Sequence, residues 1–93
     1  MKFEWDPRKD ASNRKKHQVS FEEALTVFAD PLAQIFDDED HSLDEPREII
    51  IGHLVNEQLV VICFAAREDA VRIFSARKAT KRERGDYEEN VES

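Results

Sequence analysis

Two runs rich in isoleucine, valine and leucine, at residues 48–55 and 58–66, are separated only by Asn56 and Glu57. Aliphatic side chains branched at the β-carbon favour a pleated, half-buried strand, and a polar two-residue spacer favours a hairpin. A third apolar run, at residues 70–75, follows a polar corner at residues 67–69. These runs predict an antiparallel meander, and residues 32–36 can add a fourth, short strand.

Two helices are predicted before the meander. Asp6 and Pro7 are typical of an N-cap followed by proline at the first helical position, which predicts a helix over residues 7–16. Ser20 and Glu23 match a capping box, so a second helix begins there and ends before the next proline. Its apolar residues form one stripe that faces a core: Phe21, Ala24, Leu25 and Phe28.

A last helix is predicted from residue 76 to about residue 89, where lysine, arginine, glutamate and alanine predominate. Gly85 weakens this helix by about 1 kcal/mol. Its spacing places Arg77, Lys81 and Arg84 on one side. Such a basic helix face is also compatible with a dimeric regulator that binds DNA directly, so that alternative remains open.

Together these elements define an α+β fold with two N-terminal helices, a three- to four-stranded mostly antiparallel sheet and a C-terminal helix. A chain of 93 residues is suited to a single domain over residues 1–93. No apolar run approaches membrane-spanning length and the N-terminus lacks a signal-type apolar stretch, so we expect a cytoplasmic protein. Cys63 lies within an apolar run and is expected to be a small core residue rather than a reactive thiol.

The charges are segregated along the chain, although the formal net charge is −7. Residues 22–48 contain ten acidic residues and one basic residue, whereas residues 67–84 contain seven basic and three acidic residues. Residues 8–16 contain five basic residues and one acidic residue. This pattern predicts one acidic and one basic face with different partners, unless the charges only solvate the surface.

A calcium-loop spacing is present in the acidic segment, at Asp37, Glu39, His41 and Glu48. The sharp turn of such a loop requires a glycine, but Ser42 occupies that position, and Pro46 restricts the backbone further. We therefore expect neither a metal ion nor another cofactor, and an exposed loop over residues 37–40.

Short motifs spread over some eighty residues form one ordered pattern: Phe3-Glu4-Trp5-Asp6-Pro7, Asn13, Lys16-His17, residues 19–24, Phe28, Asp30-Pro31, His41-Ser42, Glu45, Arg47, Ile51-Gly52, Arg72-Ile73, Ser75-Ala76-Arg77, Ala79, Glu83-Arg84 and Tyr87-Glu88. In order and spacing, this pattern resembles the BrnT toxin family. The sequence departs from the family pattern at Gln18, where glycine is common, at Ala65 and Ala66, where threonine often precedes the arginine, and at Gly85-Asp86 in the closing helix.

The resemblance implies a RelE-like fold and a ribonuclease that cleaves RNA and inhibits translation. It also implies a partner, a BrnA-like antitoxin whose ribbon-helix-helix part binds DNA, so that the toxin touches DNA only through the antitoxin. We expect a hetero-oligomer with two toxins and two antitoxins. The departures leave open a second hypothesis, in which the chain keeps the antitoxin interface and operon co-repression but no longer cleaves RNA.

Metal-independent cleavage of RNA begins when a 2′-hydroxyl attacks the neighbouring phosphate, so the site must stabilise charge and transfer protons. Arginine binds phosphate oxygens in a fork, and we predict that Arg67 and Arg77 line one basic groove as clamps. Histidine titrates near neutral pH, which makes His17 a candidate for proton transfer, although it can also cap its helix. His41, beside the acidic run, can be either catalytic or structural, and His53, inside a strand, is expected to pack or to lie on the surface.

The remaining candidates come mostly from the last helix. Glu83 can act as a general base, and Tyr87 can stack on an RNA base or donate a proton, unless it only docks the helix on the sheet. Further contacts to RNA are predicted for four cations: Arg72, Lys81, Arg84 and Lys16.

Overall fold

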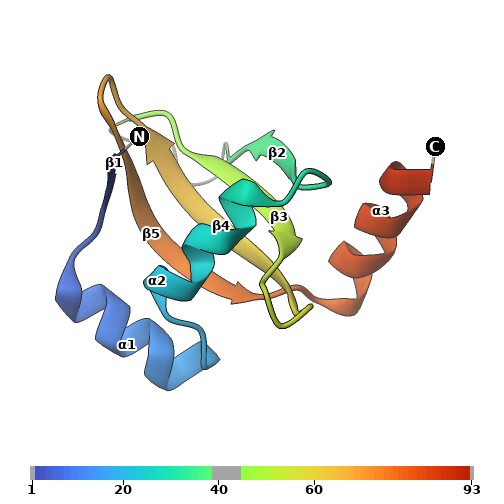
Figure 1. The fold of residues 1–93 in the computed structure, drawn as a ribbon, viewed down its shortest axis with the longest axis horizontal. Coiled ribbons are helices and arrows are strands. Elements are labelled where there is room, and N and C mark those ends of the chain that lie inside the picture. Colours follow the sequence, from blue (N-terminus) through green and yellow to red (C-terminus); the bar gives the residue numbers. More distant parts are fainter. Residues whose placement is uncertain (1, 39–44, 93) are drawn as a thin grey trace.

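The computed structural model of the protein describes residues 2–38 and 45–92. Figure 1 shows a sheet flanked by helices at both ends of the chain. The elements follow in the order β1 (Lys2–Glu4), α1 (Pro7–His17), α2 (Phe21–Ala24), η1 (Leu25–Ala29, a 3-10 helix), β2 (Gln34–Asp37), β3 (Glu48–His53), β4 (Leu59–Ala66), β5 (Ala70–Lys78) and α3 (Lys81–Glu92).

The sheet has five strands in the order β1-β5-β4-β3-β2. Strands β2 to β5 form the predicted antiparallel meander, while β1 pairs in parallel with β5, with Phe3 opposite Val71. The α+β fold is therefore confirmed, but the sheet has one strand more than the sequence analysis predicted. A strand of three residues is too short to show a period-two pattern in the sequence. Strand β1 is formed by its backbone pairing with β5.

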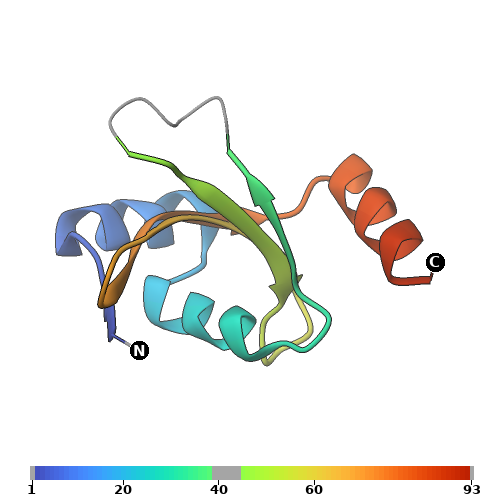
Figure 2. The same cartoon turned by 90° about the horizontal axis from the view of Figure 1, so that it is seen from above.

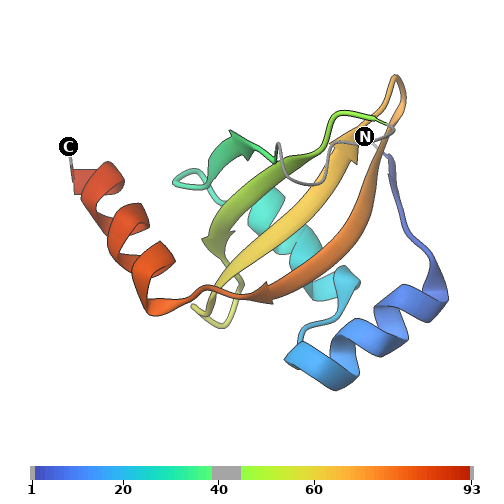
Figure 3. The same cartoon turned by 180° about the vertical axis from the view of Figure 1, so that it is seen from behind.

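One face of the sheet packs on α2 and η1, which lie behind the sheet in Figure 3. Alternation along β4 places Val60, Ile62 and Phe64 on this face, where all three are buried. The rings of Phe3, Phe28 and Phe64 continue the packing from β1 through η1 to β4, with centroid separations of 5.1 and 5.2 Å. Figure 2 shows the sheet edge-on, with α3 projecting beyond the strands at the end opposite α1.

The predicted first helix is confirmed as α1. The Asp6 carboxylate accepts a hydrogen bond from the Arg8 amide at 2.9 Å, and Pro7 occupies the first turn. The helix ends at His17, and Gln18 adopts a left-handed conformation with φ 56°. This conformation favours glycine, which accounts for the glycine that is common at this position in the family pattern, although it does not explain the glutamine found here.

The second helix begins at the predicted capping box, in which Ser20 and Glu23 exchange hydrogen bonds at 3.0 and 3.1 Å. It is α-helical only over Phe21–Ala24 and then tightens into η1. The chain turns at Asp30, whose carboxylate accepts hydrogen bonds from the amides of Leu32 and His53 at 2.9 and 2.8 Å. Asp30 thereby joins the end of η1 to the end of β3.

The central hairpin is confirmed, but its loop has three residues, 55–57, rather than two. The Leu54 amide donates to the Gln58 carbonyl at 2.9 Å, and Glu57 has φ 70°. A residue in the left-handed region at the end of a three-residue loop is a common hairpin connection. The absence of glycine is thus accommodated by backbone strain at Glu57.

The boundary between the last strand and the last helix differs from the prediction. Strand β5 continues to Lys78, and α3 begins at Lys81 rather than at residue 76. Ala76 is fully buried opposite Ile62, so burial in the sheet outweighs the helical propensity of this segment. Arg77 therefore lies on a strand, and the predicted helical stripe with Lys81 and Arg84 is wrong.

The acidic segment is also less exposed than predicted. Asp37 ends β2, and Asp38 is buried with 7% of its surface exposed. The Asp38 amide donates to the Arg47 carbonyl at 2.9 Å, which explains why this residue is held close to the sheet. The rest of the predicted loop, with His41, lies outside the described residues. None of the helices in the described ranges has the length and apolar character that a membrane crossing requires.

Candidate functional site

A hollow of about 370 Å³ lies on the open face of the sheet, which faces the viewer in Figure 3. Its floor is formed by Ile49, Val61 and Cys63, which alternate with the core residues of β3 and β4. The described residues around it supply three cations and one carboxylate: Lys9, Arg47, Arg77 and Asp38. We call this hollow the cationic groove. Its charge suits a polyanion although the whole chain is acidic.

Arg77 lies at one end of the cationic groove, on β5 opposite Val61. Its guanidinium donates two hydrogen bonds to the Glu83 carboxylate of α3, at 2.7 and 2.8 Å. These bonds lower the pKa of Glu83 to about 2 and raise that of Arg77. Glu83 also accepts from the Thr80 amide at 2.9 Å, so one carboxylate both begins α3 and orients the arginine.

The side of the cationic groove away from α3 is formed by Phe74 and two cations. The Arg47 guanidinium carbon lies 3.9 Å from the centroid of the Phe74 ring, and the Lys9 ammonium lies 5.5 Å from it. Phe74 reaches this face because a register shift leaves it without a partner on β4, between Ser75 and Ile73. This bulge places the Phe74 ring beside Lys9 of α1 and Arg47, which immediately precedes β3.

Cys63 lines the cationic groove instead of filling the core, which corrects the sequence-based expectation. Its thiol donates to the Asp38 carboxylate over 3.4 Å. Burial and the Asp38 carboxylate raise the pKa of the Cys63 thiol to about 11. The thiol is therefore protonated at neutral pH and is a poor nucleophile.

Arg67 does not line the groove with Arg77, and the prediction of one shared groove is wrong. Arg77 pairs with Val61, whereas Arg67 follows the end of β4, six residues beyond Val61 and about 20 Å away at strand spacing. Arg67 instead forms ion pairs with Glu4 at 3.0 Å and Glu45 at 2.8 Å. It thereby connects β1 to the segment before β3.

The other predicted site residues are dispersed. His17 ends α1, eight residues and about 12 Å along the helix from Lys9. Arg72 lies on β5 beside Glu4. The hydrogen bond from Arg67 lowers the pKa of Glu45 most, and the charge of Arg72 adds to this shift. Three cations are exposed and do not line the groove: Lys16, Lys81 and Arg84.

Tyr87 docks α3 on the sheet. Its side chain is buried against Ile51, Leu59 and Val61, and its ring lies 5.4 Å from that of His53. Within the described ranges its hydroxyl has no hydrogen-bond partner, and burial raises the pKa of Tyr87. These contacts suit the docking role that the sequence analysis had left open beside an RNA contact.

Sequence reasoning missed Lys9, Arg47 and Phe74 as groove residues. The basic cluster at residues 8–16 was a signal for Lys9, and Arg47 stood out as the one cation in the acidic segment. No group of histidine, cysteine and carboxylate side chains that could hold a metal ion is found where the structure is described. The calcium-loop spacing includes positions 39 and 41, which lie outside those ranges.

The fold and the groove define a small α+β domain with a cationic surface suited to a phosphate backbone. A family model described as "Ribonuclease toxin, BrnT, of type II toxin-antitoxin system" matches residues 5–83. The chain therefore belongs to the BrnT family of ribonuclease toxins of type II toxin–antitoxin systems.

A solved structure shows the same fold. The 1.1 Å crystal structure of the Brucella abortus ribonuclease toxin BrnT aligns with a TM-score of 0.70 and 24% sequence identity, covering 87% of this chain and 99% of that chain. A search of curated proteins found no match to this chain. Membership of the family implies ribonuclease activity, an RNA substrate and an antitoxin partner.

Proposed function

We propose that residues 1–93 act as a single toxin domain that cleaves RNA in the cationic groove without a metal ion and so inhibits translation in the cytoplasm. One observation carries the proposal: the Arg77 guanidinium is held at one end of a groove that Arg47 and Lys9 also line. A groove with three cations and one carboxylate attracts an RNA backbone, whereas most of this acidic chain repels it.

In the proposed reaction, a 2′-oxygen forms a bond to the adjacent phosphorus and the bond to the 5′-oxygen breaks. The 2′-hydroxyl loses a proton and the departing 5′-oxygen gains one, which leaves a cyclic phosphate and a 5′-hydroxyl. Negative charge grows on the phosphate oxygens in the transition state. Arg77 offers a planar fork of donors for these oxygens, and one preorganised donor of this kind is worth about 10²–10³ in rate.

In this proposal Glu83 is not the general base that the sequence analysis suggested. Its carboxylate is held by Arg77, and a pKa of about 2 makes it a weak proton acceptor at neutral pH. Glu83 is therefore proposed as a positioning residue that fixes the fork of Arg77. A phosphate that enters the groove competes with this carboxylate for the same donors.

The antitoxin is proposed to be a BrnA-like ribbon-helix-helix protein that forms a hetero-oligomer of two toxins and two antitoxins. Contact with DNA would then occur only through the antitoxin. The support is the resemblance noted above and the segregated charge, which leaves acidic surface for a basic protein. The exposed cations Lys16, Lys81 and Arg84, together with Arg72, remain proposed secondary contacts to RNA outside the groove.

Cleavage of total RNA by the purified chain, with excess chelator, tests the proposal. We expect cleavage by the wild type and a loss of about 10²-fold or more in Arg77→Ala. Lys15→Ala is the matched control, because Lys15 is an exposed cation of α1 that does not line the groove. Equal activity of wild type and Arg77→Ala would overturn the assignment of the groove.

A second candidate function is a module that binds the antitoxin but no longer cleaves RNA. The ion pair between Arg77 and Glu83 favours it, because the main phosphate donor is already occupied. A folded wild-type chain that fails to cut RNA, both alone and with ribosomes, but still binds its antitoxin, would establish this function instead.

A further inference from the structure

Large apolar side chains are exposed in one short segment around β2. Among the described residues five large hydrophobic side chains are exposed, and three lie within residues 32–36: Leu32 at 56%, Ile35 at 55% and Phe36 at 47%. Scattered exposure of this kind is ordinary, but here Ile35 and Phe36 expose apolar surface on both faces of one strand, which favours an interaction site. The other two, Val55 and Val91, are separate from it in the chain.

Strand β2 is also the outer strand of the sheet. Its residues pair with β3 from Gln34 opposite Ile51 to Asp37 opposite Glu48, and no described strand covers its other edge. An outer strand presents backbone donors and acceptors that can pair with an added strand. This edge contains no lysine or proline to prevent such pairing.

A second hollow, of about 180 Å³, lies between β2 and α3. Its floor is apolar, with Ile49, Ile51 and Val61, and the Phe36 side chain forms part of its wall. On the α3 side its lining includes Asp86, an exposed carboxylate. The hollow thus suits an apolar side chain with a positive charge nearby, and its acidic lining is unsuited to RNA.

This second hollow adjoins the cationic groove. Ile49 and Val61 line both hollows, and Glu83, which lines the second hollow, is bonded to Arg77 in the groove. An apolar side chain seated in the second hollow would therefore contact residues that also line the cationic groove. Occupation of one hollow would restrict access to the other.

We propose that the outer edge of β2 and the adjoining hollow are the docking site of the antitoxin. An extended antitoxin segment adds to β2 as a strand, inserts one apolar side chain into the hollow, and presents basic residues to Asp37 and Asp86. Charge favours this occupant, because both carboxylates are exposed and the chain as a whole is acidic. The inference rests on the proposed function, in which this chain is the toxin of the pair.

The test compares wild type, Ile35→Glu and the control Val55→Glu, each with the protein encoded next to the toxin gene as the probe. Val55 is an exposed aliphatic residue, at 82%, in the loop between β3 and β4. Ile35 lies on the face of β2 opposite the hollow, because it pairs with the core residue Ile50, whereas Phe36 pairs with Ile49 in the hollow. A strand added to β2 packs side chains on both faces, so we expect Ile35→Glu to place a carboxylate against an apolar contact and weaken antitoxin binding about tenfold or more. Ribonuclease activity without antitoxin should stay at the wild-type level in both variants.

Hydrogen exchange on the wild-type pair provides a second measurement that needs no substitution. We expect amides within β2 to gain protection when the antitoxin binds. Equal antitoxin affinity of wild type and Ile35→Glu, or unchanged exchange across β2, would overturn the inference while leaving the proposed function intact. A wild-type chain that neither cleaves RNA nor binds the antitoxin would overturn the proposed function, and the inference with it.

Discussion

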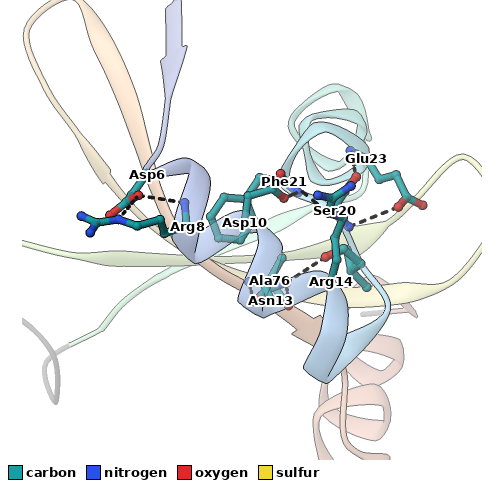
Figure 4. A network of polar contacts seen from close by, with 10 residues as sticks. Asp6, Arg8, Asp10, Asn13, Arg14, Ser20, Phe21, Glu23 and Ala76 are labelled. Carbon is teal, nitrogen blue, oxygen red and sulfur yellow. Dashed lines mark hydrogen bonds and ion pairs between the residues drawn. The ribbon is translucent and has the colours of Figure 1, made fainter.

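The side-chain amide of Asn13 forms two hydrogen bonds with the backbone of Ala76, one through its nitrogen and one through its oxygen. The Asn13 nitrogen donates to the Ala76 carbonyl at 2.6 Å, and the Ala76 amide donates to the Asn13 oxygen at 3.1 Å (Figure 4). The same nitrogen donates to the Val19 carbonyl at 2.9 Å. One buried side chain of α1 therefore holds β5 at the residue next to Arg77.

Replacement of Asn13 should have a large effect on stability. Asn13→Ala leaves three buried backbone groups without their partner, and we expect a loss of about 2–4 kcal/mol in the free energy of unfolding. Urea denaturation measures this loss. Ser12→Ala, at an exposed position of the same helix, is the control and should change little. A loss below about 0.5 kcal/mol for Asn13→Ala would show that the amide is not a structural link.

Glycine at position 18 should stabilise the protein. Gln18 has φ 56° at the end of α1, a conformation that is unfavourable for residues with a β-carbon. We expect Gln18→Gly to raise the free energy of unfolding by about 1 kcal/mol, seen as an increased Tm. Gln18→Ala keeps a β-carbon and should show no such gain. An equal gain in both variants would point to a cause other than the backbone.

The Arg77–Glu83 pair predicts a pH dependence with a definite sign. The pKa of Glu83 is lowered from 4.5 to about 2, so the pair stabilises the folded chain above pH 4.5 and is lost as the pH falls toward 2. Thermal unfolding should show wild type more stable than Glu83→Gln at pH 7, with the gap closing between pH 4.5 and 2. Glu88→Gln, on the exposed side of α3, should not reproduce this pattern.

The thiol of Cys63 should react slowly at ordinary pH. Because burial and Asp38 raise its pKa to about 11, alkylation by iodoacetamide should accelerate up to about pH 11. Asp38→Asn removes the negative charge beside the sulfur and should shift the rate profile to lower pH. Rapid alkylation of the folded wild type at pH 7 would contradict the position assigned to this thiol.

Local hydrogen-bond patterns made the early elements predictable. The Asp6 cap and the Ser20–Glu23 capping box each involve residues no more than three positions apart, so their sequence pattern is sufficient. The end of β5 was not predictable in this way, because Ala76 is held in the sheet by Ile62 and Asn13 from other parts of the chain. Tertiary contacts there outweigh the propensity of a helix-forming segment.

The candidate site was predicted only in part. Arg77 was found from its chemistry, but its neighbours in the groove come from α1, from the segment before β3 and from a bulge at Phe74. No spacing pattern in the sequence predicts that these residues lie together in the folded chain. Arg67 has an equally suitable guanidinium group, yet this group forms ion pairs with Glu4 and Glu45. Arg67 also lies at the opposite end of the paired strands β4 and β5 from Arg77.

The parallel pairing of β1 with β5 imposes an order of events during synthesis. Phe3 leaves the ribosome 68 residues before Val71, its partner, which at about 5–20 residues per second is a delay of roughly 3–14 seconds. A nascent chain that stops before residue 70 has no edge for β1 and has not yet acquired Arg77. An interrupted translation product of this toxin therefore lacks both its complete five-stranded sheet and its proposed phosphate clamp.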